Sequence, residues 1–155
     1  MEQKISRHYR KDSNQLKTIL MVGRTEVGKT TLSNTLVYGS PSGLKTQSIN
    51  RIGNIIDTPG EFLENPVYYR AIMIHSYDAD VVMLLQEAGS METLFPPNFA
   101  TAFNREVIGV ITKIDNGKST EEARKNLLAA GVEKIFEVSV YDEASVAALR
   151  AHIVK

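Results

Sequence analysis

Gly23-Arg24-Thr25-Glu26-Val27-Gly28-Lys29-Thr30 is the stretch that decides the fold, because it matches G-x-x-x-x-G-K-[ST], the pattern of a phosphate-binding loop or P-loop. The apolar, β-branched run at 18–22 precedes it and predicts a buried strand. Leu32 and Leu36 follow it four residues apart, a spacing that suits one helix face. The motif therefore has the strand–loop–helix context in which backbone N–H groups and a helix N-terminus bind phosphate.

The P-loop pattern gives its two last residues distinct roles. Lys29 is expected to contact the β- and γ-phosphates of a nucleotide, and the Thr30 hydroxyl to bind Mg²⁺. A glycine-bearing turn with an incidental lysine is the alternative, and the motifs further along the chain weigh against it. The nucleotide-contacting residues predicted for this segment are Gly23, Arg24, Thr25, Glu26, Val27, Gly28, Lys29, Thr30 and Thr31.

A second motif, Asp57-Thr58-Pro59-Gly60, follows a strand predicted at 51–56. Asp-x-x-Gly in this position is the Mg²⁺-side partner of a P-loop. Asp57 is expected to hold the metal and the Gly60 N–H to contact a γ-phosphate, whereas the alternative is a simple turn, for which this sequence is also suited. Thr46, which lies between the two motifs, is the candidate third metal ligand, with an ordinary surface threonine as the alternative.

A third motif, Thr112-Lys113-Ile114-Asp115, follows a strand predicted at 107–111 and fits [NT]-K-x-D, the guanine-reading element of GTP-binding proteins. One carboxylate can accept hydrogen bonds from both guanine N1–H and the 2-amino group, whereas adenine presents an acceptor at N1 and no 2-amino group. Asp115 is therefore expected to read the base and Lys113 to cover its plane. The alternative is an aspartate that only caps the following turn.

The last strand, predicted at 134–138, leads into Ser139 and Val140. The backbone of these two residues is expected to contact the base, with a plain loop as the alternative. Like the three earlier motifs, this one follows a predicted strand. The carboxyl edge of an open parallel sheet is where ligands bind, so we expect one nucleotide site at that edge.

The order of predicted elements indicates an α/β fold, a doubly wound and mostly parallel sheet with helices on both faces. In addition to the helix after the P-loop, we expect a helix at 67–75, a short one near 99–103 and others at 119–131 and 143–154. Ser119 and Glu122 form a capping-box pattern. The apolar face of that helix is predicted to contain Ala123, Leu127 and Leu128. The predicted strands lie at 18–22, 51–56, 80–86, 107–111 and 134–138.

Length and composition are consistent with one domain in this chain of 155 residues. Lys+Arg and Asp+Glu each total 18, so the net charge is zero and gives no indication of a nucleic-acid partner. Cysteine is absent, which excludes disulfides and thiolate catalysis. No apolar run approaches the roughly 18 residues of a membrane span, and we expect a cytoplasmic protein. Residues 1–16 are interpreted as a flexible leader or, alternatively, a docking helix for a larger assembly, and 17–155 as the domain.

Three blocks carry a more specific resemblance: 57–65 (DTPGEFLEN), 95–99 (FPPNF) and 107–115 (VIGVITKID). With the motif order, they resemble the ethanolamine-utilisation protein P / propanediol-utilisation protein V family (EutP/PduV), Ras-like P-loop NTPases of the translation-factor-related GTPase branch. The resemblance implies a bacterial accessory protein of ethanolamine or 1,2-propanediol breakdown, associated with a microcompartment, whose partners are shell proteins or pathway enzymes. It also implies either a small GTPase-like activity or an acetate kinase activity.

The sequence departs from efficient GTPases at Glu61, where they usually place a glutamine that orients the attacking water. A carboxylate beside a γ-phosphate is repelled, so we expect slow hydrolysis with Lys29, Thr30, Asp57, Gly60 and Glu61 as the catalytic set. Three hypotheses stay open. The first is a Mg²⁺-dependent protein that binds GTP and GDP, the second an acetate kinase that uses ATP or GTP in the same site, and the third a structural adaptor with a decayed site.

Overall fold

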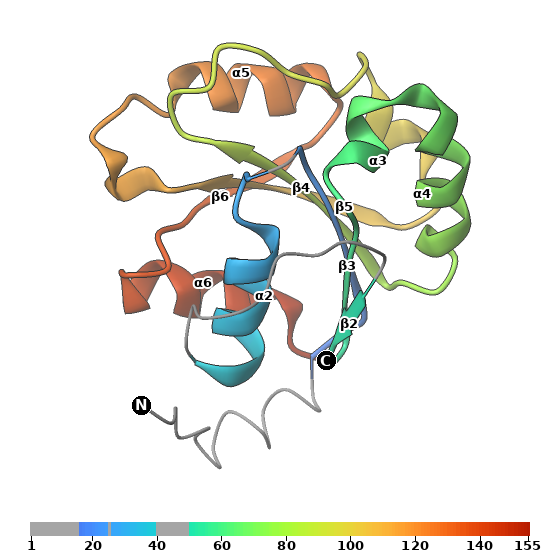
Figure 1. Ribbon diagram of the computed structural model, residues 1–155. Coiled ribbons are helices and arrows are strands. Elements are labelled where there is room, and N and C mark those ends of the chain that lie inside the picture. The colour runs from blue at the N-terminus through green and yellow to red at the C-terminus, as the bar shows by residue number, and fades with distance from the viewer. Residues whose placement is uncertain (1–15, 25, 40–49) are drawn as a thin grey trace.

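The structure, a computed structural model, describes residues 16–24, 26–39 and 50–155. One six-stranded sheet with the order β2-β3-β1-β4-β5-β6 forms its centre (Figure 1). β2 runs antiparallel to β3, and the other neighbouring pairs are parallel, which confirms the predicted mostly parallel sheet. The strands are β1 (Ile19–Val22), β2 (Asn50–Ile52), β3 (Ile55–Asp57), β4 (Val81–Glu87), β5 (Glu106–Thr112) and β6 (Lys134–Glu137).

Helices cover both faces of this sheet, as a doubly wound fold requires. In Figure 1, α2 and α6 lie on one face and α3, α4 and α5 on the other. The α-helices are α2 (Lys29–Tyr38), α3 (Glu61–Glu64), α4 (Tyr69–Ser76), α5 (Glu121–Ala129) and α6 (Glu143–Ile153). Short 3₁₀ turns are η1 (Pro66–Tyr68), η2 (Phe99–Ala102) and η3 (Ile114–Asn116).

Successive side chains along the central strands point to opposite faces of the sheet, so the sheet has one hydrophobic core on each face. In β1, Leu20 joins the buried cluster beneath α3, α4 and α5, while Met21 joins the cluster beneath α2 and α6. Leu84 and Leu85 of β4 divide in the same way. Strands covered on both faces need no polar residues, which explains why β4 is the most apolar run of the chain.

We predicted one continuous strand at 51–56, and this prediction was wrong: the segment forms a hairpin in which β2 pairs antiparallel with β3. Its turn is Gly53-Asn54, where Gly53 has a φ of 58°, a left-handed conformation that glycine adopts without steric penalty. A Gly-Asn pair between two short strands favours a two-residue turn. The continuous isoleucine pattern on either side obscured that signal.

The helix predicted at 67–75 begins as the 3₁₀ turn η1 and continues as α4. Asn65 explains the start, because its side-chain oxygen accepts a hydrogen bond from the Val67 N–H at 3.1 Å, and Pro66 supplies a preset φ at the first position. These residues make the first turn tight.

Two details predicted for α5 differ in the structure. The Ser119 hydroxyl accepts from the Glu121 N–H at 3.1 Å rather than capping Glu122, whose carboxylate lies 3.7 Å from Lys125 Nζ. Leu128 is 52% exposed, so it does not belong to the buried face that Leu127 forms. A helix of two and a half turns that packs on a sheet buries only a narrow stripe.

Leu16, the last residue of the predicted leader, is fully buried and forms an isolated antiparallel bridge with Val154. The Lys17 N–H donates to the Ile153 carbonyl oxygen at 2.8 Å, so both ends of the described domain meet. The remainder of the leader, residues 1–15, lies outside the described residues. Among the helices that are described, none combines the length and apolarity needed to cross a bilayer.

Leu127 and Leu128 provide a matched test of the core assignment, because the two leucines are adjacent on α5 and only Leu127 is buried. We expect Leu127→Ala to lower the free energy of unfolding by about 2–5 kcal/mol, through lost burial and a residual cavity. Leu128→Ala should change it by about 0.5 kcal/mol or less. Urea unfolding followed by circular dichroism measures both, and equal losses would contradict this placement of α5.

Candidate nucleotide-binding site

The P-loop connects β1 to α2 through a backbone that places special demands on its residues. A Cβ atom on Gly23 would lie 2.8 Å from Val27 Cγ1 and 3.2 Å from the Leu85 carbonyl oxygen, so only glycine fits there. Gly28 has a φ of 106° and Glu26 a φ of 67°, both in the left-handed region. The loop therefore has a tight, strained turn of the kind in which backbone N–H groups can face an anion.

Lys29 lies at the start of α2 with only 6% of its surface exposed. Its Nζ donates hydrogen bonds to the carbonyl oxygens of Gly23, at 2.9 Å, and Arg24, at 3.1 Å. Burial lowers the pKa of Lys29 from 10.5 to about 8, although the charges of Asp57 and Glu64 act to raise it. A buried ammonium beside the loop is a strong binder for a phosphate, because low local polarity strengthens charge interactions.

Thr30 and Asp57 meet between α2 and the end of β3. The Thr30 hydroxyl donates to Asp57 Oδ2 at 2.5 Å, and Asp57 is fully buried. The next residue, Thr58, fixes this position because its hydroxyl donates to the Met21 carbonyl oxygen at 2.8 Å. One hydroxyl and one carboxylate side by side fit Mg²⁺, which typically takes one or two protein oxygens and completes its shell with phosphates and water.

Gly60 connects this region to α3, since its carbonyl oxygen accepts from the N–H groups of Leu63, at 3.1 Å, and Glu64, at 3.3 Å. The carboxylate of Glu64 is therefore held close enough to influence Lys29. Three predicted site features cannot be placed: the Glu61 side chain, Thr25 and Thr46 all lie outside the described part of the structure.

The third motif is tied directly to the P-loop. The Thr112 hydroxyl donates to the Val27 carbonyl oxygen at 2.7 Å, a buried bond between residues 85 positions apart. Lys113 Nζ donates to the Glu26 carbonyl oxygen at 2.7 Å and lies 3.5 Å from a Glu87 carboxylate oxygen. These contacts fix the Lys113 side chain along the loop, and Lys113 itself adopts a left-handed φ of 57°.

A cavity of about 300 Å³ opens where the P-loop, the end of β5 and the end of β6 meet. Asp115 lies in η3 at its rim with an exposed side chain. The predicted residues that line this cavity are Val27, Gly28, Thr31, Thr112, Lys113, Asp115 and Val140. The structure thus brings the P-loop and the Asp115 motif to one pocket, large enough for a nucleoside.

Ser139, whose backbone is predicted to contact the base, is not among the residues that line the cavity. It is buried, and its hydroxyl accepts a hydrogen bond from the Tyr141 N–H at 3.1 Å. Four further residues line the cavity and were missed from the sequence: Leu32, Asn116, Val138 and Tyr141. Asn116 also anchors η3, since its side-chain nitrogen donates to the Ala88 carbonyl oxygen at 2.9 Å.

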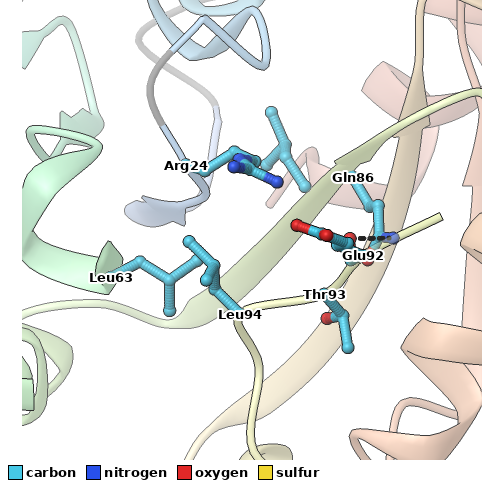
Figure 2. Close-up of a pocket in the computed structure, with 7 residues that line it drawn as sticks. Arg24, Leu63, Gln86, Glu92, Thr93 and Leu94 are labelled. Carbon is cyan, nitrogen blue, oxygen red and sulfur yellow. Dashed lines mark hydrogen bonds between the residues drawn. The ribbon is translucent and has the colours of Figure 1, made fainter. Parts of the chain in front are cut away.

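A second, much smaller pocket lies beside the P-loop, between β4, α3 and the chain after β4. Figure 2 shows Arg24 and Gln86 at this pocket, with the Gln86 side-chain nitrogen bonded at 3.2 Å to the Glu92 carbonyl oxygen. Gln86 is 5% exposed, and its Oε1 has no hydrogen-bond partner among the described residues. The free volume of about 10 Å³ has room for about one water molecule.

Comparison with known sequences finds relatives of this chain in a single protein family. The profile of the PduV-EutP family, described as "Ethanolamine utilisation - propanediol utilisation", matches residues 16–155. The chain is 33% identical over 133 residues to propanediol utilization protein PduV of Citrobacter freundii, covering 84% of this chain and 89% of that protein. It is 35% identical over 136 residues to the probable acetate kinase EutP of Escherichia coli, covering 84% and 85%.

Two solved structures share the fold at low sequence identity. Aquifex aeolicus Era bound to GDP.AlF4- has a TM-score of 0.56 and 21% identity, covering 91% of this chain. Elongation factor SelB from Methanococcus maripaludis, in complex with a GTP analogue, has a TM-score of 0.58 and 21% identity, covering 90%. The chain spans 58% of the Era chain and 33% of the SelB chain. The likeness therefore shows that this chain has the fold of the P-loop GTPases Era and SelB.

The lowered pKa of Lys29 predicts a characteristic pH dependence of stability. Between about pH 8 and pH 10.5 the unfolded chain holds a proton that the folded chain has released, so the free energy of unfolding rises with pH across this window. Relative to Lys29→Met, the unmodified protein should gain roughly 2 kcal/mol between about pH 7 and about pH 10.

Urea unfolding of both proteins at the two pH values measures this difference. Lys125→Met is the control, because its side chain is 64% exposed and no comparable gain is expected. Identical pH dependence of the unmodified protein and Lys29→Met would contradict the burial of this ammonium.

Proposed function

The chain belongs to the PduV-EutP family, and from that premise we propose that it is a guanine-nucleotide-binding accessory protein of ethanolamine or propanediol utilisation. It requires Mg²⁺ and hydrolyses GTP slowly. The observation that carries this proposal is the convergence of Lys29, Thr30–Asp57 and Asp115 on one edge of the sheet, with a cavity between P-loop and Asp115.

The phosphate end of the site uses charge and positioning. Lys29 exchanges its bonds to the Gly23 and Arg24 carbonyl oxygens for phosphate oxygens, and the P-loop N–H groups and the start of α2 bind the remaining negative charge. Thr30 and Asp57 would hold Mg²⁺, which neutralises charge between the β- and γ-phosphates. No covalent intermediate with the protein is needed.

The base end of the site uses hydrogen-bond geometry. The Asp115 carboxylate accepts from guanine N1–H and the 2-amino group, and Lys113 lies along the P-loop where its stem covers the base. Thr112 stabilises this arrangement through its bond to Val27, and so takes the structural role of the asparagine more common at this position.

Slow hydrolysis follows from residue 61. Because Glu61 stands where efficient GTPases have glutamine, the residue that should orient the attacking water carries a charge repelled by the γ-phosphate. A protein that binds GTP firmly and turns it over slowly suits a switch or assembly factor. We propose that it acts in the cytoplasm, on microcompartment shell proteins or pathway enzymes.

Asp115→Asn tests the guanine assignment. The side-chain amide presents an N–H donor where the guanine 2-amino group needs an acceptor, whereas xanthine has an acceptor oxygen at that position, so we expect GDP affinity to fall by about 10- to 100-fold and XDP affinity to rise. Isothermal titration with GTP, GDP, ATP and XDP measures this preference. Asp78→Asn, at the amino-terminal side of β4, is the control and should bind like the unmodified protein. ATP bound by the unmodified protein as tightly as GTP would refute the proposal.

Acetate kinase activity is the second candidate, because relatives 34–35% identical carry that name. In that reaction an acetate oxygen attacks the γ-phosphorus, the bond to the β,γ-bridging oxygen breaks, and acetyl phosphate and a nucleoside diphosphate leave. The observation in its favour is Arg24, whose guanidinium lines the small pocket next to Lys29 and makes no hydrogen bond or ion pair with the residues that are described (Figure 2). A pocket of one-water size must widen to admit acetate.

Trapping acetyl phosphate as its hydroxamate tests this candidate with either ATP or GTP as donor. If acetate binds beside Arg24, Arg24→Ala should raise the KM for acetate by roughly 10-fold and change nucleotide affinity by a smaller factor. Lys29→Ala should abolish product formation. Absence of hydroxamate with the unmodified protein and either nucleotide would exclude the second candidate.

A further inference from the structure

Tyr141 lies at the rim of the cavity with an exposed side chain, and we infer that it is the stacking wall of the base pocket. Stacking on Tyr141 sets the affinity for a nucleobase of any kind, while Asp115 sets its identity. This inference rests on the proposed nucleotide-binding function and adds a residue and a division of labour to it.

The ring of Tyr141 lies at the pocket and is 78% exposed. Within the described chain it makes no ring–ring contact, and its hydroxyl makes no hydrogen bond. Packing therefore does not account for it. An exposed aromatic side chain at the rim of a nucleoside-sized cavity offers a flat apolar surface to a ligand.

The backbone beneath Tyr141 is held in place although its ring is exposed. The Ser139 hydroxyl accepts from the Tyr141 N–H at 3.1 Å. The Ser145 hydroxyl lies 3.1 Å from the Ser139 carbonyl oxygen and 2.8 Å from that of Asp142, and accepts from the Ser139 N–H at 3.1 Å. These bonds fasten the loop to the first turn of α6.

A fixed backbone with a two-torsion aromatic side chain lowers the entropy cost of binding. Asp142 adds to this rigidity as the N-cap of α6, because its carboxylate accepts from the Ala144 N–H at 3.2 Å. Tyr141 is consequently presented from the end of β6, while Lys113 enters the same pocket from the end of the neighbouring strand β5. A planar base placed in the cavity contacts the stem of Lys113 and the ring of Tyr141.

The two pocket residues read different properties of a base. Every base has a π-face, so stacking on Tyr141 is tolerant of base identity. Asp115 contacts only the hydrogen-bonding edge of the base and therefore favours guanine over other bases. This division predicts that adenine nucleotides bind appreciably. Their affinity should be lower than that of guanine nucleotides by the factor that the hydrogen bonds of Asp115 contribute.

Equilibrium binding of GDP, ADP and inorganic tripolyphosphate to the full chain tests the inference. Tyr141→Ala should weaken GDP and ADP by the same factor, roughly 10-fold, and leave tripolyphosphate binding unchanged. Tyr141→Phe should bind both nucleotides like the unmodified protein, because the ring is kept. Tyr77→Ala is the control, since Tyr77 is also exposed, at 64%, and lies after α4.

Unchanged nucleotide affinity in Tyr141→Ala would overturn the inference and leave the proposed function standing. So would an equal loss for tripolyphosphate, which would indicate a general structural effect, or a loss in Tyr141→Phe, which would assign the role to the hydroxyl. Failure of the unmodified protein to bind GDP and ADP would overturn the inference together with the proposed function.

Discussion

The parallel register of the central strands is the constraint on which the site depends. Pairing of β1 with β3 sets Met21 opposite Asp57, and pairing of β4 with β5 sets Glu87 opposite Thr112. Both pairs lie at the carboxyl ends of their strands, and the P-loop leaves β1 at the same edge. A shift of one residue in either pairing would turn Asp57 away from Thr30, or Thr112 away from Val27.

Charge in this site is kept in a poorly solvated setting, which has two effects. Burial destabilises the Lys29 ammonium and lowers its pKa, although two loop carbonyl oxygens and the nearby carboxylates of Asp57 and Glu64 favour the charged form. The same desolvation makes that charge more effective toward an anionic ligand. Stability is thus given up at the position proposed to bind phosphate, a pattern common at functional sites.

Residue patterns predicted most of this architecture because the chemistry and the fold share the same segments. The P-loop, Asp57–Gly60 and Thr112–Asp115 each have a fixed local spacing and each follow an apolar strand, so their convergence could be inferred before any coordinates. Features decided by a few competing contacts were less accessible. The hairpin at Gly53-Asn54 was hidden by isoleucines, and the capping pattern at Ser119 did not reveal which N–H its hydroxyl would meet.

The cavity beside Asp115 shows the same limit. Ser139 directly follows the predicted last strand, as a base-contacting residue would. Its buried hydroxyl accepts a hydrogen bond from the Tyr141 N–H, and Tyr141 lines the cavity. Local sequence does not say which residues of one short loop face a pocket formed with a P-loop more than a hundred positions away. The helical periodicity likewise assigned both Leu127 and Leu128 to the buried face of α5, although only Leu127 is buried. A periodic pattern identifies the centre of a buried face more accurately than the residues at its border.

The bridge between Leu16 and Val154 has a practical consequence for how this domain can be handled. It lies at the start of β1, the edge of the sheet remote from the P-loop, and the carboxyl terminus follows directly from it (Figure 1). A reporter or immobilisation tag joined after Lys155 therefore emerges on the far side from the cavity. The domain can be tethered by that end to a solid support, or to a larger particle, while the cavity stays open to solvent.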